Sequence, residues 1–257
     1  MKNKKIYYGI ILFLLVYLVI FLLLFKKDTN NKNKKNYGAF AIGNDAFFLY
    51  ENGNWLSINT RYRKNYNWYL FDVYSDNEFL AKYSMIYSGI WNMFDDKKNK
   101  IDDSFNEKIG ISTDLSYKMK EYNEKDSSLD SYVKQVFERY NIPNTIALTS
   151  NRIIRVDIDN DNELESIYTI TNAFSEIEQS ITFGFIFLVD DSKIYMIYDE
   201  IFERNTLSDT CKPYVSHILD FNHKNYIMVS CAYYSDLGRK VLLYRYKDKK
   251  MKEVISN

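Results

Sequence analysis

The sequence predicts a mainly β protein built from antiparallel four-stranded units, with a small helical insert and one N-terminal transmembrane helix. Aromatic residues make up 17% of the 257 residues, and aromatic side chains favour strands. Short apolar runs alternate with turn sequences such as Asn52-Gly53. A long uncharged apolar run, residues 6–25, precedes all of them. Together these features indicate a β domain attached to a membrane.

The composition excludes some classes of protein. The 34 Lys and Arg residues balance the 34 Asp and Glu residues, whereas a nucleic-acid-binding domain normally carries a basic excess. We therefore expect no nucleic-acid partner. With only 8 glycines and 2 prolines, the chain does not have the composition of a disordered or collagen-like protein. Its length allows one large domain or two small ones.

Residues 1–27 are predicted to form an N-terminal transmembrane anchor. The uncharged run at residues 6–25 is long enough to cross the hydrocarbon core as a helix. A cleaved signal peptide would have a shorter apolar stretch and a small-residue cleavage site, and neither is present. Residues 28–36 are rich in Asn and Lys without periodicity, and we expect a flexible linker there. Residues 37–257 would then form the folded domain.

The sequence contains opposing signals for the orientation of the anchor. Basic residues favour the cytosolic side, and more lysines follow the apolar run than precede it. That count favours a cytosolic β domain. The acidic segment described below instead resembles a weak calcium module, and modules of millimolar affinity are typically extracellular. We favour a single-pass cell-membrane protein with an extracytoplasmic domain, and keep the cytosol-facing version as an alternative.

Several strand pairs can be placed by their turns. Asn52-Gly53 joins two apolar runs within residues 46–58, and both residues tolerate the positive φ of a tight hairpin turn. A second hairpin is expected at residues 183–198, with its turn at 190–193. A third is expected at residues 241–255, with its turn near 247–250.

A helical insert is expected at about residues 103–151. Ser127-x-x-Asp130 resembles a capping box. The apolar residues Val133, Val136, Phe137 and Tyr140 then fall on one helical face. Pro143 disfavours helical geometry in the preceding residue and ends the pattern. A shorter helix is also expected around residues 114–122.

The most informative motif is the acidic segment at residues 157–165, between two strand-like runs. Carboxylates stand at its first, third, fifth and ninth places, and Asn162 stands at the sixth. Alternating oxygens around a tight turn are what a hard cation such as calcium needs. A plain turn is the alternative, because Asp and Asn side chains also close turns by bonding their own backbone.

Two other segments align faintly with this one. Residues 72–79 and 220–227 share its Asp at the first place, its apolar residue at the second and its Asn at the sixth. The three copies suggest units of about four strands near residues 67–102, 152–204 and 213–256, with a partial hairpin at 39–58. Such units resemble propeller blades, so we expect an open or incomplete propeller, or a sandwich.

The segment at 157–165 resembles the calcium loop of the FG-GAP/VCBS-type repeat, whose pattern is D-x-D-x-D-G-x-x-D/E inside a β-hairpin. That family occurs in integrin α-chain propellers and in many bacterial surface proteins. The resemblance implies calcium ligation by the side chains of Asp157, Asp159, Asp161 and Glu165, and by the backbone carbonyl of Glu163. Asn162 stands where the family has Gly, and its F-G and G-A-P signatures are not evident.

Two further metal-site interpretations of these segments can be excluded. An EF-hand is rejected because its twelfth place would be Tyr168 and its flanks are β-branched rather than helical. The other two copies have lost ligand positions to Tyr74, Leu80, Lys224 and Met228. We therefore expect metal at neither of them.

Cys211 and Cys231 are the two cysteines, and the sequence allows either a disulfide or two buried thiols. A hairpin turn within residues 220–226 would place them on neighbouring strands, offset rather than directly opposite. Neither cysteine belongs to a CxxC metal motif.

No catalytic motif is evident, so we do not expect an enzyme. His217 and His223, the two histidines, are expected to be structural or exposed. The carboxylate pairs Asp190-Asp191 and Asp199-Glu200 are adjacent, and neighbours on a strand point to opposite faces. The tryptophans favour core packing, with a carbohydrate-binding platform as the alternative; they are Trp55, Trp68 and Trp91.

These observations lead to one functional expectation with two alternatives. We expect a membrane-anchored surface protein whose β domain serves binding or scaffolding, with a structural calcium loop. Its partner outside the cell would be a protein or a glycan. The alternatives are a glycan-binding or glycan-hydrolysing extracytoplasmic protein, and a cytosol-facing membrane protein with a metal-free β domain.

Overall fold

The computed structural model describes residues 37–44, 46–51, 53–57, 70–75, 78–101, 105, 108–113, 115–126, 129–173, 181–202, 210–233 and 239–256. Of these residues, 66% lie in strands and 6% in a helix, so the domain is mainly β as predicted. The predicted anchor and linker, residues 1–36, lie outside the described residues. Within the described part, no helix is long and apolar enough to cross a membrane.

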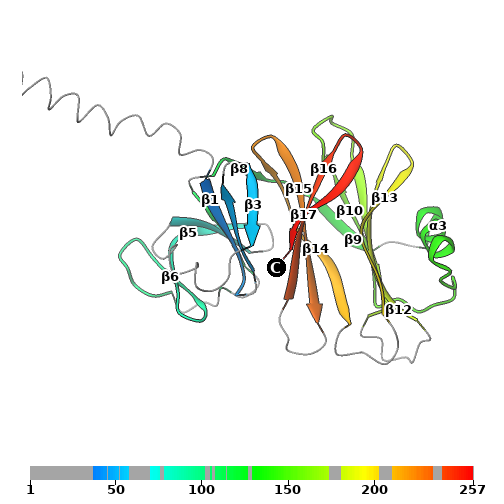
Figure 1. The fold of residues 1–257 in the computed structure, drawn as a ribbon, viewed down its shortest axis with the longest axis horizontal. Coiled ribbons are helices and arrows are strands. Elements are labelled where there is room, and N and C mark those ends of the chain that lie inside the picture. The colour runs from blue at the N-terminus through cyan, green and yellow to red at the C-terminus, as the bar shows by residue number, and fades with distance from the viewer. Residues whose placement is uncertain are drawn as a thin grey trace, which may run out of the picture.

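The strands form three antiparallel sheets, which stand side by side with sheet B between sheets A and C (Figure 1). Sheet A has the order β3-β2-β1-β7-β4-β5-β6 and contains β1 (Tyr37–Ile42), β2 (Ala46–Glu51), β3 (Asn54–Ser57), β4 (Leu70–Ser75), β5 (Glu78–Tyr87), β6 (Trp91–Phe94) and β7 (Ile109–Ser112).

Sheet B has the order β17-β16-β15-β14-β8, and sheet C has the order β13-β12-β11-β10-β9. Sheet B contains β8 (Tyr117–Met119), β14 (Cys211–Phe221), β15 (Lys224–Tyr233), β16 (Arg239–Lys247) and β17 (Lys250–Ser256). Sheet C contains β9 (Asn123–Asp126), β10 (Ser150–Val156), β11 (Glu165–Thr171), β12 (Thr182–Asp190) and β13 (Lys193–Phe202). Strands β10–β13 of sheet C therefore coincide with the unit expected at residues 152–204. Strands β14–β17 of sheet B coincide with the unit expected at residues 213–256.

The predicted hairpins are confirmed, and their turns use few glycines. β2 pairs with β3 across Asn52-Gly53, and Gly53 has a φ of 90°. The β12–β13 turn consists of Asp191 and Ser192, and the β16–β17 turn consists of residues 248–249; all four have positive φ. Positive φ at both central residues matches the twist of paired strands.

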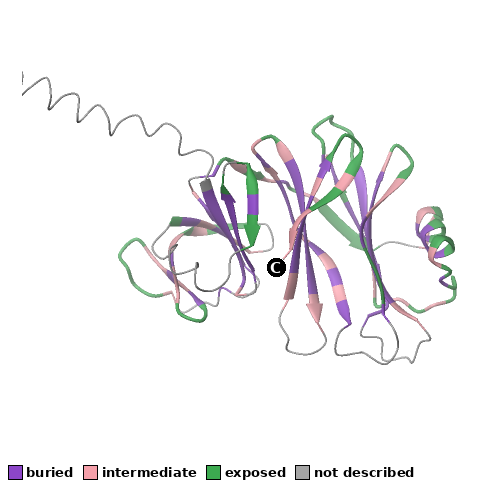
Figure 2. Cartoon of the chain, in the orientation of Figure 1, coloured by how far each residue is buried: buried purple, intermediate pink, exposed green. Residues whose placement is uncertain are grey.

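Apolar layers separate the sheets. One cluster lies between sheets A and B and includes Phe40, Trp55 and Phe221. A second lies between sheets B and C and includes Ile154 and Ile218. Figure 2 shows the buried residues along the strands, with exposed residues at the hairpin tips. A third cluster covers the other face of sheet A, and a fourth joins sheet C to α3 (Ser131–Tyr140).

The helix forms as its apolar spacing predicts, but it begins later than expected. Val133, Val136 and Phe137 are buried against sheet C. Asp130 is the N-cap, and its side chain accepts hydrogen bonds from the backbone N–H groups of Tyr132 and Val133. Ser127, the expected first residue of the capping box, lies outside the described residues. Asn141, just before Pro143, ends the helix with a φ of 56°.

Two organisational predictions were wrong. The hairpin at residues 39–58 is not a separate partial unit, because β7 pairs with both β1 and β4 and joins it to residues 67–102 in sheet A. The expected helical insert at 103–151 contains β7, β8 and β9 as well as α3, and β8 lies where the short helix at 114–122 was expected. These three strands are short and pair with strands that are distant in sequence, so their local sequence carries little strand signal.

Residues 109–126 form a crossing segment that contributes one strand to each sheet. β7 belongs to sheet A, β8 pairs with β14 in sheet B, and β9 pairs with β10 in sheet C. Tyr117 in β8 also donates a hydrogen bond to Asp72 in β4. The crossing segment therefore links all three sheets beside the sites described next.

Candidate functional site

The acidic loop, residues 157–164, connects β10 to β11 at one end of sheet C. The last pair of residues between the two strands is Val156 and Glu165, so the loop begins and ends where the strands end. Asp157 folds the loop by accepting hydrogen bonds from the backbone N–H groups of Asn160 (2.6 Å), Asp161 (3.2 Å) and Asn162 (3.1 Å). The φ angles of Asn160 and Asn162 are 67° and 72°, a geometry that Asn tolerates better than most residues.

Three of the predicted ligands are brought together. One carboxylate oxygen each from Asp157, Asp159 and Glu165 lies within 4.8 Å of the others. Calcium binds oxygens at 2.3–2.6 Å, so oxygens bound to one ion lie at most about 5 Å apart. Among the described residues, the side chains of Asp161 and Glu163 do not belong to this group. Asp161 instead accepts a hydrogen bond from the backbone N–H of Glu163 (2.8 Å).

Two carboxyl groups of this group, Asp159 and Glu165, lie where ionisation is disfavoured. Glu165 is only 5% exposed, and burial followed by the nearby Asp159 raises the pKa of its carboxyl to about 7, although Oε2 accepts a hydrogen bond from the Ile158 N–H (2.6 Å). Burial and then the Asp161 and Asp190 carboxylates raise the pKa of Asp159. Both shifts oppose ionisation, so a cation bound to these oxygens would relieve an electrostatic cost.

Lys120 supplies a cation on the backbone side of the loop. It lies between β8 and β9 on the crossing segment and is only 8% exposed. Its ammonium donates to the carbonyl oxygens of Asp157 and Ile158 and to Oδ1 of Asn160, which uses all three of its donors. Burial lowers the pKa of Lys120, and the Asp157 carboxylate opposes that shift. Sequence analysis missed this residue, because nothing local in the sequence connects residue 120 to the loop.

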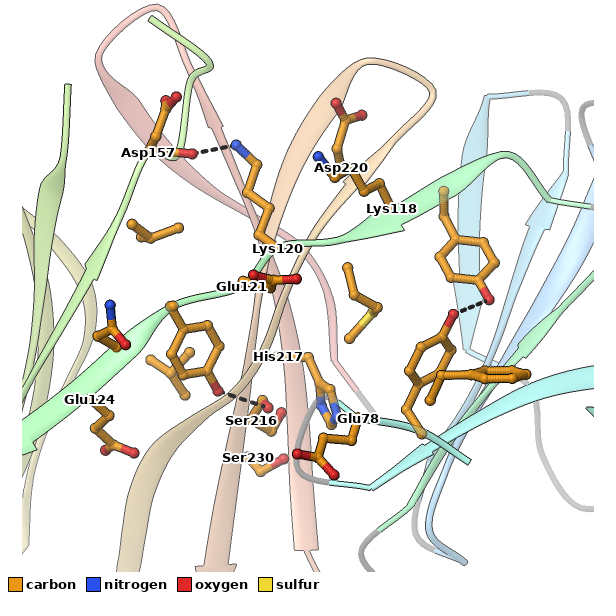
Figure 3. Close-up of a pocket in the computed structure, with 18 of the residues that line it drawn as sticks. Glu78, Lys118, Lys120, Glu121, Glu124, Asp157, Ser216, His217, Asp220 and Ser230 are labelled. Atoms are coloured by element: carbon orange, nitrogen blue, oxygen red, sulfur yellow. Dashed lines mark hydrogen bonds between the residues drawn. The ribbon is translucent and has the colours of Figure 1, made fainter. Parts of the chain in front are cut away.

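A groove of about 2020 Å³ runs from the acidic loop along the crossing segment (Figure 3). Asp157 and Asn160 lie at its rim, β4 and β5 of sheet A form one side, and β14 of sheet B forms another. Typical small-molecule sites measure roughly 300–1,000 Å³, so this groove has room for an extended ligand.

His217 projects into this groove from β14, on the side of Glu78 (Figure 3). It is 5% exposed, and neither ring nitrogen has a hydrogen-bond partner among the described residues. Burial lowers the pKa of its imidazole to about 4, so the ring is neutral at pH 7. Buried polar groups are nearly always hydrogen-bonded, and each exception calls for an explanation.

A β-bulge aims His217 at the groove. Val215 pairs with Val229 and His217 pairs with Met228, so Ser216 is an extra residue on β14. Val215 and Ile218 both face sheet C, three positions apart instead of two. Without the bulge, His217 would follow Val215 and face sheet C. Bulges often occur beside active sites, where they redirect a side chain.

No protein-family model, curated protein or solved structure matches the chain. The resemblance of the acidic loop to the FG-GAP/VCBS-type repeat therefore remains a prediction.

The three aligned segments share a position in the fold but not a loop. Each lies at the first hairpin of a run of consecutive strands: β4–β5, β10–β11 and β14–β15. In the third copy the turn is only Asn222 and His223, both with positive φ, while Asn225 at the sixth place lies in β15. In the first copy, residues 76–77 lie outside the described part.

The structure also places the remaining candidates. Cys211 and Cys231 form a disulfide, with Cα atoms 5.4 Å apart on neighbouring strands and in offset register, as the hairpin predicted. Trp55 and Trp91 are buried in the core rather than forming a platform, and Trp68 lies outside the described residues. His223 lies in the β14–β15 turn.

All four carboxylates of these pairs have hydrogen-bond or ion-pair partners, three of them on neighbouring elements and that of Glu200 on its own strand. Asp190 accepts a hydrogen bond from Tyr246, and Asp191 forms an ion pair with Lys249. Asp199 accepts from Tyr140, and Glu200 accepts from Tyr198. These bonds hold the β12–β13 hairpin against its neighbours.

Proposed function

We propose that the chain is a single-pass, membrane-anchored protein whose extracytoplasmic β domain serves binding or scaffolding. The observation that carries the proposal is the Cys211–Cys231 disulfide in the core between sheets B and C. Disulfides form and persist in oxidising compartments and are rare in the cytosol. This supports the extracytoplasmic orientation over the lysine count, while the apolar run at residues 6–25 supplies the anchor.

The binding part of the proposal rests on the groove. It is larger than a typical small-molecule site, and it contains a buried imidazole whose nitrogens have no partner among the described residues. An unpaired buried polar group costs about 1–3 kcal/mol, which a ligand with matching groups would recover.

We further propose that the units at residues 152–204 and 213–256 are propeller-blade-like, in an open arrangement related to FG-GAP/VCBS-type repeats. Each is a run of four consecutive antiparallel strands, with the aligned Asp-containing segment at its first hairpin.

Calcium is proposed as a structural brace of the acidic loop. Asp157, Asp159 and Glu165 fit a hard cation by oxygen type and by spacing, and the raised pKa values of Asp159 and Glu165 show that a further positive charge would be favourable there. A bound calcium ion would supply positive charge between β10 and β11. Asp157 would still hold the loop backbone, and Glu165 would still hold the Ile158 N–H.

Protease treatment of intact cells tests the orientation. An extracytoplasmic domain predicts loss of the β domain while a cytosolic marker stays intact. A fully protected domain, together with cysteines that react with alkylating reagents without prior reduction, would place the domain in the cytosol and remove the proposal.

Calorimetric titration of the full chain in detergent tests the brace. We expect binding at millimolar or submillimolar calcium, and loss of binding heat for Asp159→Asn together with Glu165→Gln. Absence of heat at about 5 mM calcium would show that the loop is a metal-free turn, because weak calcium modules bind at 10⁻⁴–10⁻³ M.

A second candidate function, glycan binding, is favoured by the hydroxyl, imidazole and aromatic groups that line the groove.

A further inference from the structure

We propose that the groove between β5 and β14 binds a neutral oligosaccharide, with His217 hydrogen-bonding a sugar hydroxyl and Phe79 stacking on a sugar ring. The inference rests on the proposed binding function and names its ligand class. Four observations carry it: the pairing state of His217, the blocked main-chain edge beside it, the mixed charge of the groove and the exposed ring at its rim.

The pairing state of His217 matches a hydroxyl group. A neutral imidazole presents one N–H donor and one acceptor nitrogen, and both lack partners among the described residues. A sugar hydroxyl can donate to the acceptor nitrogen or accept from the N–H, and pairing both nitrogens takes two hydroxyls. Ser216 also lines the groove on this strand; its hydroxyl donates to the Met228 carbonyl (3.2 Å), so its oxygen could act only as an acceptor for a ligand.

A peptide added as a strand is disfavoured, because the neighbouring edge of β14 is already occupied. The carbonyl of Ile218 accepts the backbone N–H of Lys120 (2.9 Å), and the carbonyl of Ser216 accepts the Tyr122 hydroxyl (3.5 Å). Pro213 has no N–H to offer, and proline on an edge strand opposes strand addition. The groove therefore presents side chains rather than free main-chain groups.

The charge of the groove disfavours an anionic ligand. Carboxylates outnumber basic groups along it: the acidic side chains are Asp72, Glu78, Glu121, Glu124, Asp157 and Asp220, and the basic ones are Lys118, Lys120, Arg155 and Arg239. Arg239 donates to the Tyr214 hydroxyl (3.0 Å), so part of its charge is used within the protein. A site for a polyanion would need a clear basic excess.

The rim of the groove carries an exposed aromatic ring. Phe79 in β5 is 53% exposed, and its ring lies 5.6 Å from that of Tyr74 in an edge contact. An edge contact leaves a ring face available. The apolar face of a sugar ring would remove that surface from water, which is favourable by about 25 cal/mol per Å² of apolar area.

The test uses the full chain in detergent micelles and four neutral hexasaccharides: cellohexaose, chitohexaose, maltohexaose and mannohexaose. Isothermal titration should show binding of at least one of them with a Kd at or below about 1 mM. For that sugar, His217→Phe and Phe79→Ala should each weaken binding at least about tenfold, which corresponds to 1.4 kcal/mol.

Matched controls separate binding from folding. Ile90→Ala removes a similarly exposed side chain between β5 and β6, outside the groove, and His223→Asn removes the other histidine; neither should change the affinity. The melting temperature of His217→Phe should stay the same or rise, because a buried unpaired group is removed. A purely structural His217 would not combine unchanged or higher stability with lost binding.

Two results would overturn the proposal: no binding of any hexasaccharide at about 5 mM, or binding that neither variant weakens. Either result leaves the proposed membrane location intact, since protease accessibility and cysteine reactivity test that separately. A cytosolic domain that still binds a hexasaccharide would instead contradict the location alone.

Discussion

The acidic loop and the His217 region lie on either side of the crossing segment, and they differ in whether their polar groups are hydrogen-bonded. In the loop, Asp157 accepts three backbone N–H groups and Lys120 uses all three of its donors. In the groove, both nitrogens of His217 lack partners within the described residues. Saturated groups hold a local structure, whereas unsatisfied ones cost stability unless a ligand completes them. The contrast supports the two proposals, a structural role for the loop and a binding role for the groove.

Lys120→Met should give the largest loss of stability. The substitution leaves three neutral oxygen acceptors without their ammonium donor, and a buried group left without its hydrogen bond costs about 1–3 kcal/mol, so we expect a loss of about 3 kcal/mol. Urea unfolding of the full chain in detergent measures the change. Lys118→Met is the matched control, since Lys118 is exposed on β8, and its effect should stay within about 0.5 kcal/mol. Equal effects of the two variants would contradict the structural role of Lys120.

Asp157→Ala should destabilise the domain by about 1–2 kcal/mol, because three backbone N–H groups of a largely exposed loop lose their acceptor. The comparison is Asp220→Ala, at the equivalent first place of the third copy. Its turn is closed by Asn222 and His223, so the loss should be below about 0.5 kcal/mol. Thermal unfolding of both variants decides the matter. A loss of stability for Asp220→Ala as large as that for Asp157→Ala would show that the two Asp residues stabilise their turns equally.

His217→Phe should change stability in the other direction, by about 1 kcal/mol in favour of folding. It replaces a buried group that lacks hydrogen bonds among the described residues with an apolar one, which removes the cost of the unpaired nitrogens. Urea unfolding without sugar measures the gain. A loss of more than about 1 kcal/mol would mean that His217 stabilises the fold, and the contrast with the acidic loop would fail.

Sequence reasoning succeeded where the determinants were local. The hairpins follow from turn residues such as Asn52-Gly53, and the turn at Asp191 and Ser192 lies where it was expected. Asp157, Asp159 and Glu165 come together because they are close in the chain. The face of α3 also follows from the spacing of Val133, Val136 and Phe137.

It failed where the determinants were distant. Lys120 reaches the loop only because β8 and β9 place it between sheets B and C, which local spacing cannot show. His217 faces the groove because of the bulge at Ser216, and a strand read with regular alternation puts it on the opposite face. The match of Asn162 with Asn225 was likewise misleading, since only Asn162 has a positive φ.

The pH dependence of stability is the smallest predicted effect. It is also the most direct comparison of the two regions, because their contributions to stability change with pH in opposite directions. The folded pKa of Glu165 is raised from 4.5 to about 7, so its contribution to stability is present below pH 4.5 and is lost as the pH rises through 7. The folded pKa of His217 is lowered from 6.5 to about 4, so its contribution is present above pH 6.5 and is lost as the pH falls through 4.

In the unmodified protein these contributions partly cancel between pH 4.5 and 6.5. Removing one of them should expose the other. Relative to the unmodified protein and with a calcium chelator present, Glu165→Gln should make stability rise more steeply with pH across this window, and His217→Phe should make it fall. Urea midpoints at half-unit pH intervals measure both slopes. Slopes that change in the same direction would mean that one region has been assigned the wrong charge state.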